Sequence, residues 1–172
     1  MESPIRCARI VDSPDFKQSM RAVVASVNVI TCRYEGTHYG LTATAFCSVS
    51  ADPPTVLICV NGNASACERI RMSGQFCVNV LTPGMEDLAA AFAGKIAPEH
   101  RFASGRWREL ESGNLMVEGC AAAFDCEVKS VLQEGSHWVV VGTVRQCEYA
   151  TIPALAYANG VYGRFEEAGA VR

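Results

Sequence analysis

Residues 39–61 read YGLTATAFCSVSADPPTVLICVN, and the alternating part of this stretch bears on both the fold and the function. Side chains two positions apart in a β-strand point to the same face. A strand over residues 39–51 would therefore gather Thr42, Thr44, Phe46, Ser48 and Ser50 on one face. Such a face suits either the solvated edge of a sheet or the binding of a ligand by small hydroxyl side chains. The alternation alone leaves both readings open.

The residues around this stretch predict a chain built mainly of strands. Asp52-Pro53-Pro54 should end the first strand, because proline cannot donate a hydrogen bond to a sheet. The apolar run TVLICV then predicts a strand over 55–60 that is covered on both faces. Further strands are expected at 27–34, 76–81, 120–135, 136–149 and 161–165, and helices at 13–25, 65–74 and 85–94. Residues 95–118 have weak periodicity and are expected to be irregular.

Strands that follow strands disfavour parallel β-α-β winding. We therefore expect a mainly β, antiparallel barrel, closed or nearly closed, with a few short helices on its outside. No internal repeat or linker divides the chain, so residues 1–172 are predicted to form one domain with a helical extension over about 1–25. The motifs of a Rossmann dinucleotide site, a Walker phosphate loop and an esterase nucleophile are missing from the sequence.

Composition excludes several classes of function. The chain has 172 residues, 49% of them hydrophobic and 19% charged, with a formal net charge of -3 and no basic cluster. Binding of nucleic acid is therefore not expected. No apolar run is long enough to span a membrane, and the first residues show no secretory signal. We expect a cytoplasmic protein that does not associate with membranes.

The nine cysteines have no C-x-x-C spacing, and they are expected to be reduced thiols. Those inside strand-like runs are expected to be small buried core residues: Cys47, Cys59, Cys77 and Cys126. The three histidines lie far apart and predict no metal site. No base stands beside a nucleophile in any local motif. Chemistry would then come from a bound cofactor, which the protein binds and orients.

The opening stretch resembles the signature of the flavin reductase-like family, the small FMN-binding split-barrel proteins. The matching pattern is GLTATAF, then SVS and two prolines before an apolar strand. Later segments are similar to the family in the same order: FCVNVL (76–81), LAAAFAG (88–94), GSH (135–137), VVVGTV (139–144) and YGRF (162–165). The resemblance covers about residues 20–165.

This resemblance implies a six-stranded split barrel with a Greek-key core, assembled as a homodimer. It also implies an NAD(P)H:flavin oxidoreductase that passes hydride from nicotinamide to N5 of FMN, or of FAD. A partner monooxygenase, or another acceptor, would then take the electrons from the reduced flavin.

The family pattern implies site residues at matching positions. Backbone amides of Thr42, Ala43 and Thr44 would line the edge of the flavin ring, where negative charge grows during hydride transfer. The positions implied for the ribityl and phosphate tail are Ser48, Val49, Ser50, Asn61 and Ser65.

Charged and aromatic positions complete the implied site. Lys95 and Arg101 are candidates for the phosphate, which needs a cation. His137, Tyr162 and Arg164 match the nicotinamide side. The family often has Gly-Asp-His where this chain has Gly135-Ser136-His137, which changes what holds the histidine.

Two alternatives remain open. The protein could retain its FMN and reduce another acceptor, such as corrinoid cobalt or a ferric chelate. It could also be a flavin- or haem-binding split-barrel protein without turnover. The sequence does not choose between NADH and NADPH, because Arg101, Arg106 and Arg108 could each meet a 2′-phosphate.

Overall fold

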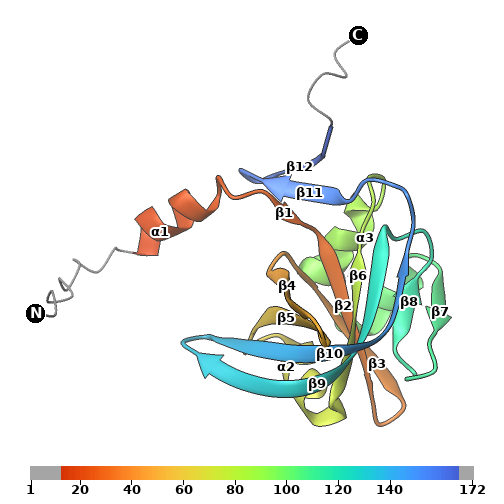
Figure 1. Cartoon of the computed structure of the whole chain (residues 1–172). Coiled ribbons are helices and arrows are strands. Elements are labelled where there is room, and N and C mark those ends of the chain that lie inside the picture. The colour runs from red at the N-terminus through yellow and green to blue at the C-terminus, as the bar shows by residue number, and fades with distance from the viewer. Residues whose placement is uncertain (1–12, 167–172) are drawn as a thin grey trace, which may run out of the picture.

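The computed structural model describes residues 13–166, which form a mainly β fold (Figure 1). The strands are β1 (Ala25–Ser26), β2 (Asn28–Tyr34), β3 (Thr37–Ala43), β4 (Phe46–Ala51), β5 (Pro54–Asn61), β6 (Gln75–Val80), β7 (Trp107–Glu109), β8 (Leu115–Val117), β9 (Ala122–Glu134), β10 (His137–Tyr149), β11 (Leu155–Ala158) and β12 (Val161–Arg164). The helices are α1 (Ser13–Met20), α2 (Ser65–Ser73), α3 (Glu86–Ala90), the π-helix η1 (Ala91–Lys95) and the 3-10 helix η2 (Pro98–Ala103).

The main sheet is antiparallel and has seven strands in the order β3-β2-β6-β9-β10-β5-β4. Six strands were expected, and the number differs because the predicted strand over 39–51 breaks at Thr44 and Ala45. Its halves, β3 and β4, become the two edge strands of the sheet. Asp52 and Pro53 separate β4 from β5, as the prolines predict.

The short link between β3 and β4 makes the sheet curl. Ala43 and Phe46 are three residues apart, so their Cα atoms lie within about 11 Å of each other. Yet these residues stand at opposite edges of the sheet, which must therefore bend round until the edges approach. Within residues 13–166, no hydrogen-bonded pairing joins β3 to β4, so hydrogen bonds do not close the barrel.

Two buried clusters hold the curled sheet on its two faces. Along β2, Val29 belongs to one cluster and Ile30 to the other, as alternation in a strand requires. Ile30 packs with Ile58 and Phe76 inside the curl. Val29 packs on the other face, in the cluster that contains Phe92 of η1. Each face of the central strands is therefore covered.

The segment expected to be irregular contains short elements that are tied to the sheet. Helix η2 and the β7–β8 pair fall within residues 95–118. Asn79 of β6 accepts a hydrogen bond at Oδ1 from the backbone N–H of Val117, 2.8 Å away. Asn114 donates to the buried carboxylate of Asp125 over 2.8 Å. These bonds satisfy buried polar groups and fix β7 and β8 on the sheet.

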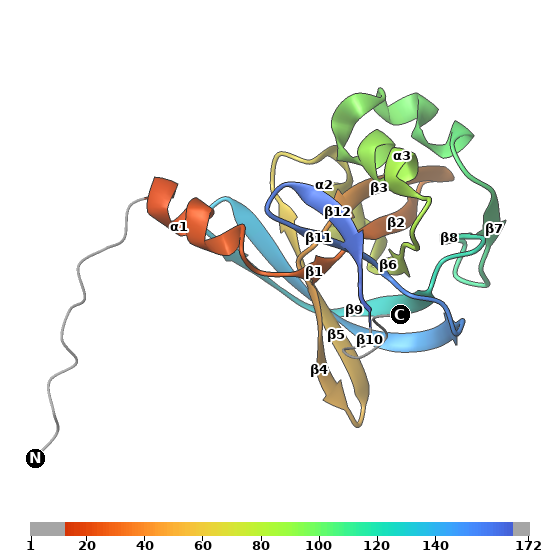
Figure 2. The ribbon, with the colours of Figure 1, turned by 90° about the horizontal axis from the view of Figure 1, so that it is seen from above.

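Helix α1 and the tip of the β9–β10 hairpin project from the same side of the body (Figures 1 and 2). None of the residues of α1 is buried. The helix ends at Met20 rather than near Ala25, where β1 begins and pairs with β11. Residues 1–12 of the expected helical extension lie outside the described part of the chain.

Candidate functional site

The predicted face of hydroxyl side chains is divided by the break at Thr44 and Ala45. Thr42 lies on β3 at one edge of the sheet, whereas Ser48 and Ser50 lie on β4 at the other. Two of the hydroxyls also serve the fold itself. Thr42 Oγ1 donates to the carbonyl oxygen of Ala89 over 2.6 Å, and Ser50 Oγ donates to that of Asp52 over 2.8 Å. The stretch is therefore not one continuous polar face.

The end of β3 borders a small cavity of about 210 Å³, here called the β3 cavity. It brings together the predicted ring-edge residues and the predicted Tyr162 of β12. Its lining residues are Val27, Thr42, Ala43, Thr44, Ala93, Tyr157 and Tyr162. The small side chains of Ala43 and Ala93 leave room for a flat apolar ligand that lies close to the backbone of β3.

A second cavity of about 420 Å³, the polar cavity, adjoins the β3 cavity, since Thr42 and Ala93 line both. It brings together three more predicted residues, namely Asn61, Ser65 and Arg101. The complete lining is Leu41, Thr42, Asn61, Asn63, Ala64, Ser65, Phe92, Ala93 and Arg101. The β3 cavity and the polar cavity thus offer an apolar end and a polar end to one elongated ligand.

The polar cavity has the features of a phosphate site. Ser65 is the first residue of α2, whose N-cap residue Ala64 makes no side-chain capping hydrogen bond. Cys67 N–H donates to Ala64 O over 2.9 Å, which leaves the N–H groups of Ser65 and Ala66 at the start of the helix for an anion. Arg101 donates from Nε to Ile96 O over 3.2 Å and from Nη1 to Gly40 O over 3.0 Å. These bonds hold the guanidinium at the cavity wall with its other N–H groups still available.

A third and larger cavity of about 780 Å³ lies between α1, β4 and β11, and we call it the α1 cavity. Thr44 and Tyr157 line both this cavity and the β3 cavity, so the two adjoin. Its other walls include the apolar side chains of Phe16, Met20 and Leu57. A planar ligand could therefore approach the end of β3 from this side.

The structure does not bring the predicted Ser48, Val49 and Ser50 to these cavities. Ser48 pairs with Val56 of β5, and Asn61 lies at the other end of that strand. The register between β4 and β5 shifts between Ser48 and Ser50, so Val49 forms a bulge. Within one chain, the two predicted halves of the tail site are thus at opposite ends of β5.

The remaining predicted cation and histidine lie outside the cavities too. Lys95 is exposed at the end of η1 and lines none of the cavities described above. His137 begins β10 opposite Asn61, which places it next to the polar cavity without lining it. Its Nδ1 lies 2.9 Å from Ser136 Oγ, so the serine hydroxyl contacts the ring where the family often has a carboxylate.

Tyr162 and Arg164, both predicted on the nicotinamide side, differ in their surroundings. The Tyr162 ring lies 5.4 Å from the ring of Tyr157, and both rings line the β3 cavity. Burial, with Tyr157 and Glu86 nearby, raises the pKa of the Tyr162 phenol, which therefore stays a neutral hydrogen-bond donor. Arg164 forms an exposed ion pair with Glu166 at 2.9 Å and lies outside the cavities.

Several lining residues were not predicted from the sequence, above all Ala93 and Tyr157. Ala93 belongs to η1, and π-helical turns are frequent at functional sites. It lies in the LAAAFAG segment, which predicted a helix and resembled the family but indicated no site residue. Tyr157 lies on β11, a strand that the sequence analysis did not predict, and no pattern in residues 150–160 pointed to it.

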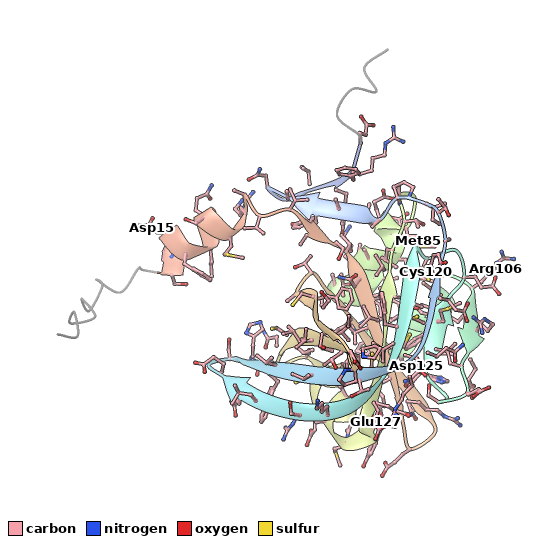
Figure 3. All side chains as sticks on the ribbon, in the orientation of Figure 1. Asp15, Met85, Arg106, Cys120, Asp125 and Glu127 are labelled. Carbon is pink, nitrogen blue, oxygen red and sulfur yellow. The ribbon has the colours of Figure 1, made fainter. Side chains whose placement is uncertain are left out.

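Two arginines that could have met a phosphate are engaged elsewhere. Arg106 points outward beside β7 and β8 (Figure 3), and its Nε lies 3.1 Å from Glu118 Oε2. Arg108 forms an ion pair with Glu148 at 2.6 Å. Neither lines the β3 cavity, the polar cavity or the α1 cavity.

Residues 13–166 contain no cluster of three or more His, Cys, Asp or Glu side chains that could bind a metal. None of the helices among them is long and apolar enough to cross a membrane. The described cysteines are free thiols, and Cys47 is exposed on β4 rather than buried as predicted, because β4 is an edge strand.

Known proteins are similar to this chain in sequence and in fold. Residues 20–166 match the flavin reductase like domain. The chain is 38% identical over 151 residues to the FMN reductase (NADH) RutF of Agrobacterium fabrum, covering 87% of each chain. It is similar to the nitrilotriacetate monooxygenase component B of Mycobacterium thermoresistibile, with a TM-score of 0.84, 31% identity and coverage of 90% of this chain and 87% of that one. It is also similar to the NADH:FAD oxidoreductase SgcE6 of Streptomyces globisporus, with a TM-score of 0.83, 28% identity and coverage of 93% and 99%. The chain belongs to the flavin reductase-like domain family.

Proposed function

We propose that the protein is an NADH-dependent flavin reductase that acts on FMN. The observation that carries this proposal is the adjacency of the β3 cavity and the polar cavity, which share Thr42 and Ala93. Together they provide a narrow apolar end and an end with a fixed cation. FMN has the matching parts, a flat ring at one end and a phosphate at the other. The relative from Agrobacterium fabrum, named as an FMN reductase that uses NADH, supports the same substrates.

The residues fit FMN at both ends. Arg101 and the N–H groups at the start of α2 would hold the phosphate, and the Ser65 hydroxyl adds a donor. The methyl group of Ala43 would let the ring approach the edge strand closely. Half of the N–H groups of an edge strand face away from its neighbour, so β3 can donate to polar atoms of the ring. The family roles of Ser48, Val49, Ser50, Lys95, His137 and Arg164 remain proposals for residues outside these cavities.

Bound FMN would supply the hydride acceptor of the reaction. The residues of the chain contribute position and electrostatics rather than a proton or a nucleophile. Backbone N–H groups at Thr42–Thr44 would stabilise the negative charge that grows on the ring edge. Tyr162 and Tyr157 would hold the nicotinamide ring within reach, since transfer between stacked rings depends on distance and orientation.

NADH is the proposed donor in preference to NADPH. A 2′-phosphate needs a cation, and the ion pairs of Arg106 with Glu118 and of Arg108 with Glu148 occupy two of the candidates. Arg101, the third, is assigned to the FMN phosphate.

We also infer a homodimer built on a split barrel. Apolar side chains are exposed on α1, on the residues that follow it and on the β9–β10 hairpin: Phe16, Met20, Val23, Val24 and Leu132. Helix α1 and the tip of this hairpin project from the same side of the body (Figure 1). A second copy that covers this side would remove them from water. Sedimentation velocity should show a dimer, and replacing Phe16 and Val24 together by serine should yield monomer. A wild-type monomer at micromolar concentration would contradict this assembly.

Reduced flavin would then serve a separate acceptor, such as a partner monooxygenase. The similar structure named as component B of a nitrilotriacetate monooxygenase supports this role. The free thiols support a reducing compartment such as the cytoplasm.

Steady-state NADH oxidation tests the function. With catalytic amounts of protein, we expect the rate to rise and saturate as free FMN is added, because each turnover releases reduced flavin. A protein that retains FMN would instead reach its full rate at stoichiometric flavin. No NADH oxidation at any flavin concentration would overturn the proposed function.

A further inference from the structure

A fourth cavity lies beyond the polar cavity, on the other side of Arg101. It has a volume of about 210 Å³, and Ser65 and Arg101 line both it and the polar cavity. Its remaining walls come from the start of β3 and from η2: Thr37, His38, Tyr39, Gly40, Pro98 and Glu99. We call it the Glu99 cavity. It lies where a flavin would continue past its first phosphate.

The wall between the two cavities is fixed. Arg101 is bonded through Nε to Ile96 O and through Nη1 to Gly40 O, at 3.2 Å and 3.0 Å. Donation to two backbone carbonyls orients the guanidinium, so it cannot swing aside for a longer ligand without losing both bonds. A phosphate in the polar cavity would meet this fixed cation, and anything attached to that phosphate would meet the Glu99 cavity next.

The charge that lines the Glu99 cavity opposes the second phosphate of FAD. Glu99 adds a carboxylate where a second phosphate would arrive, and like charges at close range repel. His38 does not offset it through Nε2, which lies 3.1 Å from the carbonyl oxygen of Gly113 and must donate there.

From this geometry we infer that Glu99 is a specificity-determining residue, which selects FMN against FAD at the end of the flavin site. The inference rests on the proposed function, since it places the flavin phosphate in the polar cavity. It concerns flavin choice, which differs between the similar proteins: one is named for FMN and another for FAD. Glu99 would act on the second phosphate alone and leave FMN binding nearly unchanged.

The test compares the dissociation constants of oxidised FMN and FAD for the wild type, for Glu99→Gln and for Glu134→Gln. Glu134 is an exposed carboxylate at the end of β9, outside the cavities, so its variant controls for a change in net charge. Quenching of flavin fluorescence measures binding without NADH. We expect wild type to prefer FMN, and Glu99→Gln to tighten FAD by about three- to tenfold, the effect of a partly exposed charge pair. FMN affinity should change by less than about twofold.

The outcomes separate this inference from the function on which it rests. The role of Glu99 would be overturned, with FMN binding intact, if Glu99→Gln left the ratio of the FAD and FMN dissociation constants unchanged. A gain in affinity of the same size for both flavins would overturn it too. If Glu134→Gln tightened FAD binding as much as Glu99→Gln does, the effect would come from net charge alone, and the role of Glu99 would be overturned as well. If wild type binds neither flavin, the proposed function itself fails.

Discussion

At Ala43 the proposed flavin site is sensitive to the size of the side chain. It lines the β3 cavity, whose volume is about 210 Å³. Replacing its methyl group by the isobutyl group of leucine would fill part of the space that the ring needs. We expect Ala43→Leu to weaken FMN binding by about tenfold or more, which corresponds to ~1.4 kcal/mol. Fluorescence titration with oxidised FMN measures this change.

Ala51→Leu is the matched control, because Ala51 is exposed at the end of β4 and lines none of the cavities. It should bind FMN as wild type does. Equal FMN affinity in Ala43→Leu and wild type would show that the flavin ring does not bind in the β3 cavity.

The cysteines differ sharply in their surroundings. Burial, with Asp125 nearby, raises the pKa of the Cys126 thiol from 9.0 to about 12. Burial likewise raises that of Cys32 to about 12. Only the thiolate reacts readily with alkylating agents. At pH 8 iodoacetamide should therefore label the exposed Cys47 and Cys147 well before Cys32 and Cys126, as peptide mass spectrometry would show. Equal labelling of all four would contradict the buried placement.

The same pKa shift predicts how stability depends on pH. The folded protein holds the Cys126 proton more tightly than the unfolded chain, whose thiol has a pKa near 9.0. Stability from this group is therefore complete below pH 9 and falls as pH rises toward about 12. Cys126→Ala should flatten the fall in unfolding free energy between pH 9 and 11. An identical slope in both proteins would show that Cys126 does not contribute.

At the level of elements, the close packing of η1 on β3 forms one wall of the site. A Cβ atom at Gly40 would lie 2.6 Å from Cε1 of Phe92 and 3.1 Å from the carbonyl oxygen of Ile30. Gly40→Ala must then displace Phe92, and with it Ala93, which lines both cavities. We expect a loss of about 1–3 kcal/mol in unfolding free energy, measured by urea denaturation, and weaker FMN binding.

Gly163→Ala provides the comparison, because a Cβ atom at this β12 glycine meets nothing within 4 Å. Its unfolding free energy should stay within about 0.5 kcal/mol of wild type. Equal stability of Gly40→Ala and wild type would mean that η1 does not pack on β3 as described.

The elements also show what the sequence could and could not predict. Alternation and prolines predicted β5 and the end of β4 well, because these signals are local. The break at Thr44 could not be predicted, because the segment TATAF alternates as a continuous strand would. In the structure the chain passes there from one edge of the sheet to the other. That crossing depends on long-range pairing, which no window of sequence contains. For the same reason Tyr157, brought in by β11, was missed.

For the whole molecule, family motifs predicted more of the residues that line the β3 cavity and the polar cavity than residue chemistry did. Asn61, Ser65 and Arg101 come from separate segments, and only the fold shows that they line one cavity. Ser48–Ser50 matched the same signature but lie at the other end of β5. Their distance from the cavities follows from the division of one motif between two edge strands. The order of motifs along a chain therefore indicates a family without giving the geometry of its site.

We propose that the β3 cavity and the polar cavity hold FMN in position to receive hydride from NADH. Anaerobic titration of the protein with one equivalent of FMN and then with NADH tests this placement most directly. We predict that flavin absorbance near 450 nm bleaches with one NADH per FMN, and that Ala43→Leu bleaches far more slowly at the same concentrations while Ala51→Leu matches the rate of wild type. Full flavin absorbance after excess NADH with the wild-type protein would contradict the claim.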